Sequence, residues 1–467
     1  MIFSSMTFLR CFLPILLLMY FIVKDKYKNV VLLIFSLLFY AWGEPKYIIL
    51  MLLSITINYI LGILIDKYIN KKMGTAIFII AILINILLLG YFKYFNFLIN
   101  NLNVFLGLSL SERSISLPIG ISFYTFQIMS YIIDLYRKNI KVQKNILDLA
   151  LYISFFPQLI AGPIVKYKDI QSQMNKRKVT LDGFANGTKR FIYGLSKKVL
   201  IANSLALIAD TIFDAEASSI TTLFTWISSI AYSLQIYYDF SGYSDMAIGL
   251  GKMFGFTFME NFDLPYKSKS ITEFWRRWHI SLSTWFKEYV YIPLGGNRKG
   301  RIRTYINLWI VFAITGIWHG AAWNFVAWGL FHGFFIFIEK LGLKKILDKF
   351  YIIGHIYTLL IINFGWILFR ITSLRKGLVL IKKMVIPTSN VSTIRLHDVI
   401  TAKNILIFVI AILFSGIIQL IYSKIKNIKI IKKVFPKCEI FVISILWVLC
   451  ISSLVSNTYN PFIYFRF

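Results

Sequence analysis

The stretch NVVLLIFSLLFYAWG (29–43), followed closely by YIILMLLSITINYILGILI (47–65), decides the fold class of this chain. Neither run contains a charged side chain. A helix that crosses a membrane needs about 20 consecutive, mostly apolar residues, and similar runs recur along all 467 residues. We therefore predict an all-α, polytopic integral membrane protein.

The amino-acid composition agrees with a chain that is surrounded by lipid. Hydrophobic residues make up 58% of the sequence and charged residues 15%, whereas soluble domains average about 45–50% apolar and about 25% charged residues. We expect one integral-membrane domain over residues 1–467, with its core motifs between 116 and 333. Cys11, Cys438 and Cys450 show neither metal nor redox spacing, so they are interpreted as core thiols and no metal site is expected.

The basic residues mark the loops between apolar runs. The chain carries 51 Lys and Arg against 21 Asp and Glu, for a net charge of +30. Loops such as KDKYK (24–28) and DKYINKK (66–72) fit the positive-inside rule for cytoplasmic loops, so the charge reflects topology and no nucleic-acid partner is expected. The basic interval 252–303 is placed on the cytoplasmic side for the same reason. We expect about eleven to thirteen spans, near 8–23, 28–43, 47–65, 74–98, 115–136, 199–213, 219–238, 304–318, 321–339, 352–370, 402–421 and 439–456.

One apolar segment, 146–165, does not fit a simple crossing. It lies between two basic loops, and Pro157, Gly162 and Pro163 interrupt its helical pattern. A re-entrant or in-plane segment reconciles the charge with the hydropathy, and such backbone survives at membrane depth only where protein or a water-filled cavity covers it. The segment therefore indicates an internal chamber.

SITEFWRRWHISLSTWFKEYVYIP (270–293) predicts an amphipathic helix at the membrane surface. Ser270 and Glu273 have capping-box spacing, and the aromatic residues that follow recur at steps of three and four over 272–290. His279 falls on the aromatic face and is expected to point inward. It is either a hydrogen-bonded core histidine or a functional group.

TGIWHGAAWNFVAWGLFHG (315–333) places His319 between apolar runs. An ionisable group at membrane depth is a functional candidate by default, because a charge at mid-bilayer costs about 2.5–3.5 kcal/mol even by the lower estimates. A neutral imidazole escapes much of this cost and can accept a proton from a hydroxyl nucleophile. The alternative is a hydrogen bond between helices. His332 is a weaker candidate on the same helix, and His355 and His397 have no supporting context.

The two carboxylates within YYDFSGYSDMAIGLG (237–251), Asp239 and Asp245, are expected to face a cavity, to pair with basic residues of the cytoplasmic loop or to cap a broken helix. We name Asp239 and Asn324 as candidate cavity-lining groups. A buried histidine and a basic cytoplasmic face suit an acyl donor that carries phosphates, such as coenzyme A, and Arg276, Arg277 and Lys287 are the candidate donor-binding residues. Composition and periodicity do not distinguish such a chamber from a transport pathway.

The chain resembles the membrane-bound O-acyltransferase (MBOAT) family, in its bacterial branch of alginate O-acetylation and teichoic acid D-alanylation, and it is more similar to the alginate type. The resemblance covers most of the chain. It rests on SLPIGISFYTFQIMSYIIDLYR (116–137), FFPQLIAGPIVKY (155–167), YYDFSGYSDMAIGLGKMFGF (237–256), NFDLPYKSKSITEFWRRWHISLSTWFKEYVYIPLGGNRKG (261–300), TGIWHGAAWNFVAWGLFHG (315–333) and NPFIYFRF (460–467).

The resemblance implies a function for two histidines. His319 matches the active-site histidine of the family, and His279 matches a second histidine of its bacterial members. It also implies a ring of helices around a central chamber with a cytoplasmic funnel. We expect a multi-pass protein of the bacterial inner membrane that transfers an acetyl group from acetyl-CoA toward an extracytoplasmic glycan, without a permanently bound cofactor.

The resemblance further implies a partner and leaves rivals open. Family members commonly work with a separate acetyl-transfer protein of the SGNH-hydrolase type, so we expect one here. The nearer alternative is D-alanyl transfer to teichoic acid. The alternative from another class is a transporter or flippase of lipid-linked glycans.

Overall fold

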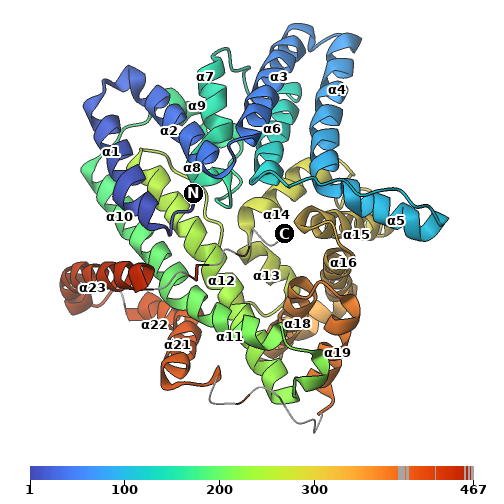
Figure 1. Cartoon of the computed structure of the whole chain (residues 1–467), viewed down its shortest axis with the longest axis vertical. Helices are drawn as coiled ribbons and strands as arrows, with labels where there is room; N and C mark the ends of the chain where they lie inside the picture. The colour runs from blue at the N-terminus through green and yellow to red at the C-terminus, as the bar shows by residue number, and fades with distance from the viewer. Residues whose placement is uncertain (388–394, 396–398, 426, 457–458, 461–462, 464–467) are drawn as a thin grey trace. The chain divides into compact units, whose positions relative to one another are not determined.

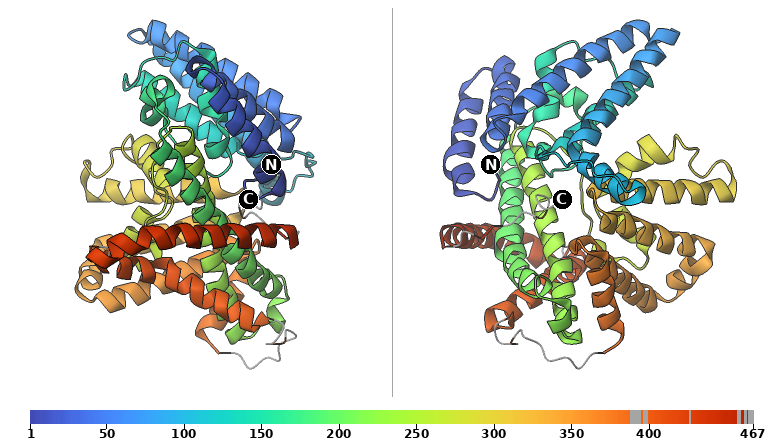
Figure 2. Two further views of the ribbon diagram at one scale, coloured as in Figure 1. Left: turned by 90° about the vertical axis from the view of Figure 1, so that its left-hand side faces the viewer. Right: turned by 45° about the vertical axis from the view of Figure 1, so that its right-hand side comes forward.

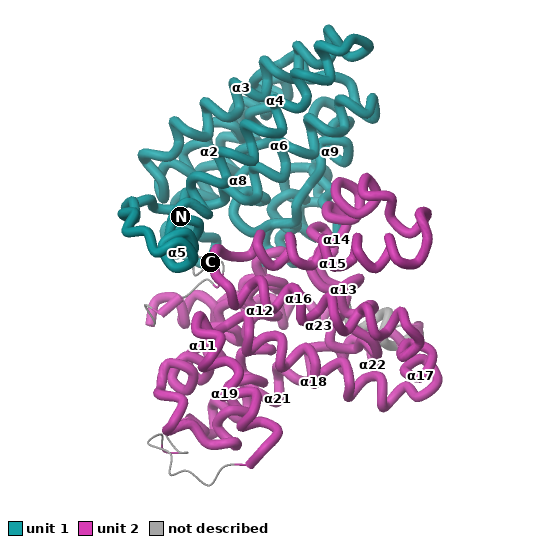
Figure 3. The backbone as a smooth tube through the Cα atoms, turned by 90° about the vertical axis from the view of Figure 1, so that its right-hand side faces the viewer, with its two compact units in different colours: residues 1–191, 246–259 teal, residues 192–245, 260–467 magenta. Residues whose placement is uncertain are grey.

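The structure is a computed structural model that describes residues 1–387, 395, 399–425, 427–456, 459–460 and 463. All regular elements in these residues are helices, which confirms the all-α prediction. They form two compact units: Met1–Phe191 with Met246–Met259, and Ile192–Asp245 with Glu260–Phe467 (Figure 3). The single domain expected over 1–467 stays a prediction. His397 and most of the motif at 460–467 lie outside the described residues.

Unit 1 contains the N-terminal helices (Figure 1). Its elements are η1 (Phe8–Phe12), α1 (Leu13–Ile22), η2 (Asp25–Tyr27), α2 (Lys28–Gly43), α3 (Tyr47–Tyr68), α4 (Lys72–Leu89), η3 (Gly90–Tyr94), α5 (Phe95–Leu106), α6 (Ile121–Tyr136), α7 (Ile146–Ser154), α8 (Phe156–Leu159), α9 (Tyr167–Lys176) and most of α10 (Leu181–Ser196). The apolar helices α3 and α4 stand side by side as a hairpin (Figures 1 and 2). Each predicted span of this region therefore corresponds to a helix.

The predicted break in the apolar segment 146–165 is confirmed. α7 ends at Ser154, and α8 covers only Phe156–Leu159, with Pro157 in its first turn. The chain then runs without regular structure to α9, and nearly all its side chains from Asp148 to Tyr167 are buried. The freed backbone is partly satisfied by side chains, since Phe156 N donates to Ser36 Oγ over 3.2 Å. Irregular backbone is thus covered by protein, as such a segment requires.

Unit 2 carries the second half of the sequence and the segments rich in histidine and tryptophan. Its elements are η4 (Lys197–Ala202), α11 (Asn203–Phe213), η5 (Ala217–Ser219), most of α12 (Thr222–Met253), η6 (Pro265–Lys267), α13 (Ile271–Arg277), α14 (Ile280–Phe286), η7 (Lys287–Tyr291), α15 (Gly300–His319), α16 (Trp323–Ile338), η8 (Glu339–Leu343), α17 (Lys344–Lys349), α18 (Tyr351–Arg370), α19 (Leu374–Val385), α21 (Ala402–Ile412), η9 (Leu413–Ile417), α22 (Ile418–Ile425) and α23 (Lys429–Ser456). The long helix α23 packs against the π-helical turn η4 (Figure 2).

Seven helices among the described residues are long and apolar enough to cross a membrane. They cover Tyr47–Tyr68, Lys72–Leu106, Leu181–Phe213, Trp323–Lys349, Tyr351–Arg370, Ala402–Ile425 and Lys437–Ser456. The apolar helix Phe8–Ile22 is shorter, and α2 and α6 have 16 residues each. An integral membrane protein is confirmed, and the number of crossings beyond these seven stays a prediction.

The polar interruption at 237–251 does not break a helix. α12 continues from Thr222 to Met253, so of the expected roles for this segment, capping a broken helix is wrong. Its glycines allow close packing instead: a Cβ at Gly242 would collide with the backbone oxygen of Gly194 on α10. Small residues are what lets two helix backbones approach this closely.

Candidate active site

His319 is the last residue of α15, and its position depends on close packing between α15 and α16. A Cβ at Gly316 would collide with the backbone oxygen of Phe325, and one at Gly329 would collide with that of Phe312. The two helices therefore form a tight hairpin, which ends at His319 where Gly320 takes an extended conformation. The imidazole is thereby held on well-packed secondary structure.

The His319 ring is surrounded by aromatic side chains. Its centroid lies 4.9 Å from the ring of Trp318, 5.0 Å from that of Trp328 and 5.2 Å from that of Phe369, all edge to face. The side chain is 9% exposed. The C-terminal end of a helix carries partial negative charge that favours a cation, so a proton accepted by His319 would be stabilised by α15.

A small cavity opens beside His319. It is lined by Ile236, Phe240, Trp278, His319, Trp328, Trp366, Phe369 and Ile463. Its volume of about 20 Å³ is enough for one water molecule. His319 is the ionisable side chain of this lining, so an atom placed in the cavity meets one imidazole and otherwise apolar or aromatic walls.

The predicted helix over 272–290 is broken at its histidine. Ser270 caps α13 as expected, with its side chain accepting from Glu273 N over 3.0 Å. α13 then ends at Arg277, and α14 begins at Ile280. Between them His279 has left-handed backbone geometry, with φ 44°. This conformation is uncommon for a residue with a Cβ and tends to mark functional sites.

The hydrogen bonds of Asn261 fix the tautomer of His279. Asn261 Oδ1 accepts from the backbone N–H of Ser281 over 3.2 Å and from its hydroxyl over 2.8 Å, so this atom is an oxygen. The same oxygen lies 3.1 Å from His279 Nδ1, which must therefore carry the proton. Nε2 keeps its lone pair, and it is buried without a hydrogen-bond partner among the described residues. It is thus a buried proton or hydrogen-bond acceptor.

Burial also sets the charge of His279. The ring is 1% exposed, as the sequence predicted for an inward-facing residue, and its edge contacts Phe240 with centroids 4.6 Å apart. Desolvation lowers the pKa of His279 from its usual 6.5 to about 3. The imidazole is therefore neutral at physiological pH.

Two aromatic residues connect the histidines. Trp318 lies 6.4 Å from the His279 ring and 4.9 Å from the His319 ring, measured between centroids. Phe240 contacts His279 and lines the cavity beside His319. The structure therefore brings together two histidines that are 40 residues apart in the sequence (319 − 279).

The candidate cavity-lining residues Asp239 and Asn324 are both buried but are not among the eight residues that line this cavity. Asp239 forms an ion pair with Lys198 of η4 and accepts from Ile463 N over 2.9 Å. The carboxylate is therefore paired, but the expectation that its partner comes from the basic loop 252–303 is wrong. Asn324 donates to Leu368 O over 3.3 Å. A lining role for either residue stays a prediction.

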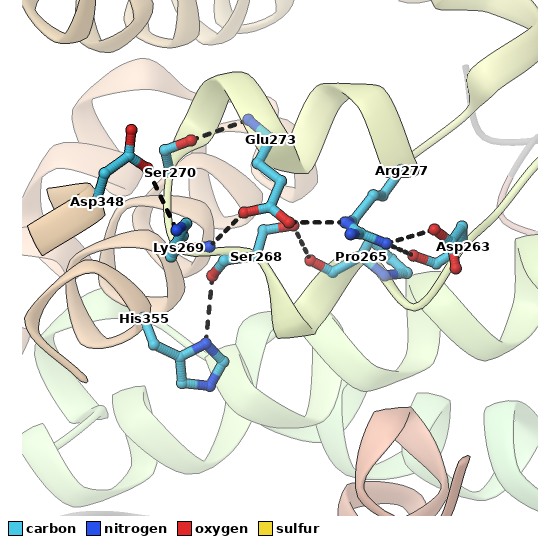
Figure 4. A network of polar contacts seen from close by, with 9 residues as sticks. All are labelled: Asp263, Pro265, Ser268, Lys269, Ser270, Glu273, Arg277, Asp348 and His355. Atoms are coloured by element: carbon cyan, nitrogen blue, oxygen red, sulfur yellow. Dashed lines mark hydrogen bonds and ion pairs between the residues drawn. The ribbon is translucent and has the colours of Figure 1, made fainter. Parts of the chain in front are cut away.

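The candidate donor-binding residues occupy different surroundings, and Figure 4 shows those of Arg277. Arg276 and Arg277 line a surface pocket of about 420 Å³ together with Asp263, Lys269, Ser270, Glu273, Lys344 and Asp348. Arg277 is already paired, with Asp263 and with Glu273. Arg276 is exposed, and Lys287 is exposed outside this pocket. Of the three, Arg276 is best placed to meet an anionic ligand.

Three residues of the site were not named as candidates from the sequence. Asn261 sets the His279 tautomer from 18 residues upstream, and Trp366 and Phe369 reach the cavity from α18. Lys198 could have been found from the sequence, because the pair Lys197 and Lys198 interrupts an apolar run. His332, the weaker candidate, lies on α16, so the expectation that it shares a helix with His319 is wrong; its ring lies 5.1 Å from that of Trp328.

Comparisons with known proteins agree with these features. Residues 136–375 match the model of MBOAT, the membrane-bound O-acyltransferase family. The probable alginate O-acetylase AlgI of Pseudomonas putida is 45% identical over 380 residues, which cover 80% of this chain and 78% of the relative.

Two further relatives carry related names. The peptidoglycan O-acetyltransferase of Helicobacter pylori is 38% identical over 82% of this chain and 80% of its own length. The teichoic acid D-alanyltransferase of Bacillus subtilis is 31% identical over 48% of this chain and 60% of its own length. Together with the buried histidines and the apolar helices, these matches establish that the chain belongs to the membrane-bound O-acyltransferase family and is an integral membrane acyltransferase.

Proposed function

We propose that this protein transfers an acetyl group from cytoplasmic acetyl-CoA toward hydroxyls of an extracytoplasmic polysaccharide, with His319 as general base. The observation that carries the proposal is the position of His319 on the wall of a cavity that is otherwise apolar and aromatic, with a second, neutral histidine that shares Trp318 as a ring neighbour. The names of the alginate and peptidoglycan O-acetylating relatives support acetyl as the acyl group and a polysaccharide as the acceptor.

The proposed reaction needs one proton acceptor. The acceptor hydroxyl attacks the thioester carbonyl carbon, so that a C–O bond forms and the C–S bond breaks. His319 takes the hydroxyl proton and returns it to the leaving thiolate, and general-base catalysis of this kind contributes about 10²–10⁴ in rate. His279 Nε2, which has an available lone pair, orients the acceptor or relays the proton.

Donor binding is assigned to the basic loop 267–303. Arg276 would bind a phosphate of coenzyme A. Arg277 would maintain the geometry of the pocket through its ion pairs with Asp263 and Glu273. Lys287 would add positive charge outside the pocket. The donor is a co-substrate, and no resident cofactor enters the scheme.

The proposal extends to location and partners. The protein lies in the bacterial inner membrane, with the interval 252–303 in the cytoplasm. The acceptor is either a sugar or a serine of a separate SGNH-type protein that completes the transfer outside. A transporter is set aside, because the family to which the chain belongs is one of acyltransferases.

Release of free thiol tests the donor. Purified protein in vesicles should release coenzyme A from acetyl-CoA when an alginate oligosaccharide or the partner protein is supplied. D-alanyl transfer is the remaining rival, and the teichoic acid relative supports it over only 48% of this chain. Failure with acetyl-CoA, together with transfer of D-alanine from a thioester carrier, would replace acetylation by that rival.

A further inference from the structure

A second, larger groove lies in unit 2, apart from the His319 cavity. It has a volume of about 480 Å³, within the range of about 300–1,000 Å³ that is usual for ligand sites. Its walls come from α12, from α18, and from the bent helix formed by α21, η9 and α22. None of its lining residues belongs to the cavity of His319.

The walls of this groove are apolar and partly exposed. Side chains from all three walls are 37–45% exposed: Ile230, Leu359, Leu360, Ile412, Ile417 and Leu420. Two of the walls, Tyr351–Arg370 and Ala402–Ile425, are candidate membrane spans. In a membrane the groove therefore opens toward lipid along its length.

The lining of the groove includes one lysine. Lys267, in η6, lines the groove beside His355, whose Nδ1 donates to Ser268 O over 3.2 Å (Figure 4). No acidic residue lines the groove, and Lys267 has no ion-pair partner among the described residues. By contrast, Lys269 is 3.4 Å from Asp348. The groove thus combines a lysine that has no acidic neighbour in the lining with walls that are mostly apolar.

Aromatic rings separate this groove from the site of catalysis. Tyr266 lines the groove, and its ring lies 6.3 Å from that of Trp278, which in turn lies 4.8 Å from that of Trp366. Trp278 and Trp366 line the His319 cavity on the other side. A thioester donor in the groove would be shut off from His319 by this layer, which argues against the donor as occupant.

We propose that this groove binds one anionic phospholipid, with its phosphate at Lys267 and an acyl chain between α12, α18 and the bend at Gly416. Basic pockets between spans on the cytoplasmic side are suited to anionic headgroups, and each lysine near them contributes about fivefold in affinity. The site does not depend on the acyl-transfer reaction.

Photo-crosslinking to full-length protein in vesicles tests this site. The probe is phosphatidylglycerol with a photoreactive acyl chain, compared with the same probe made as phosphatidylcholine. Peptides that contain 230–234, 359–363 and 412–420 should be labelled by the anionic probe several-fold more than by the neutral one. Peptides of α3 and α4, which are exposed spans of unit 1, serve as the internal reference.

Two variants alter the lining of the groove, one at its lysine and one at its glycine. Lys267→Gln should lower the anionic labelling about fivefold. Gly416→Leu should block the chain, since Gly416 lines the groove and the open space around its Cβ position leaves room for the added side chain. The matched controls are Lys382→Gln, an exposed lysine of α19, and Gly90→Leu, where a Cβ also meets nothing.

The controls should keep wild-type labelling in the groove, and all four variants should keep it on α3 and α4. Equal labelling by both probes would indicate unspecific surrounding lipid and overturn the proposal. Unchanged labelling in both Lys267→Gln and Gly416→Leu would overturn it as well. Displacement of the probe by acetyl-CoA would make the groove a donor channel instead.

Discussion

At the scale of single residues, the site is organised around two imidazoles in unlike settings. His319 ends a helix and faces a cavity, whereas His279 sits in left-handed backbone with one nitrogen fixed by Asn261. Both histidines could be named from motifs in the sequence, but the left-handed backbone and the tautomer of His279 could not. The tautomer depends on Asn261 and Ser281, whose relation to His279 exists only after the chain has folded.

The burial of His279 predicts a pH dependence of stability. Its pKa is about 3 in the folded protein and about 6.5 in an unfolded chain. Between these values the unfolded chain holds a proton that the folded one lacks, so stability falls as the pH drops below about 6.5, by about 2 kcal/mol at pH 5. Thermal unfolding of the detergent-purified protein from pH 7 to pH 5 should show this decline, and His279→Gln should make it less steep. His355→Gln is the matched control, and an equally steep decline in His279→Gln would refute the assignment.

At the scale of elements, the sequence predicted where helices lie better than where they bend. Apolar runs marked most helices, and Pro157 marked the break between α7 and α8. The break at His279 was missed because aromatic residues on both sides keep a continuous helical period and no glycine or proline interrupts them. The sequence also did not predict the unbroken helix α12, because the glycines of this segment suggested a break. In the structure these glycines allow close packing between helices instead.

The α15–α16 hairpin should be intolerant of side chains at its glycines. Gly316→Val would force the backbones of the two helices apart, and overpacking of this kind costs about 1–3 kcal/mol or more. We expect a lower unfolding temperature and loss of acyl transfer, because His319 ends this helix. Gly90→Val is the control, since a Cβ there meets nothing. Equal stability of the two variants would contradict the close approach.

The buried ion pair of Lys198 and Asp239 predicts that the effects of replacing its two residues on stability are not additive. Both side chains are 2% exposed, so removal of one partner leaves a buried charge and costs about 3–5 kcal/mol. Lys198→Met and Asp239→Leu should each destabilise the protein strongly, and the double variant should recover much of the loss. Unfolding of all four proteins in detergent measures the coupling. Additive losses in the double variant would show that the two charges do not stabilise each other.

At the scale of the whole molecule, the charge pattern predicts how the chain lies in the membrane. The interval 252–303 should face the cytoplasm. A single cysteine at Arg298→Cys, with Cys11, Cys438 and Cys450 changed to Ser, tests this. A membrane-impermeant thiol reagent should label it in inverted membrane vesicles but not in intact cells. Labelling in intact cells would reverse the topology and remove donor access from the cytoplasm.

The family and the acyltransferase class could be predicted from the sequence, because several long motifs agree along the chain. The size and lining of the cavity could not, since Phe240, Trp278 and Trp366 come from three separate elements. The roles of His319 and His279 remain a proposal that the structure supports through burial, hydrogen bonding and aromatic contacts.

Acetylation in cells tests the central role of His319 most directly. A strain that lacks this protein would be complemented with wild type, His319→Ala or the control His355→Ala, and the ester-linked acetyl groups of its surface polysaccharides would be measured by mass spectrometry. Wild type and His355→Ala should restore acetylation. His319→Ala should accumulate in the membrane at the wild-type level yet lose at least about 10²-fold of the activity. Near wild-type acetylation by His319→Ala would contradict the account.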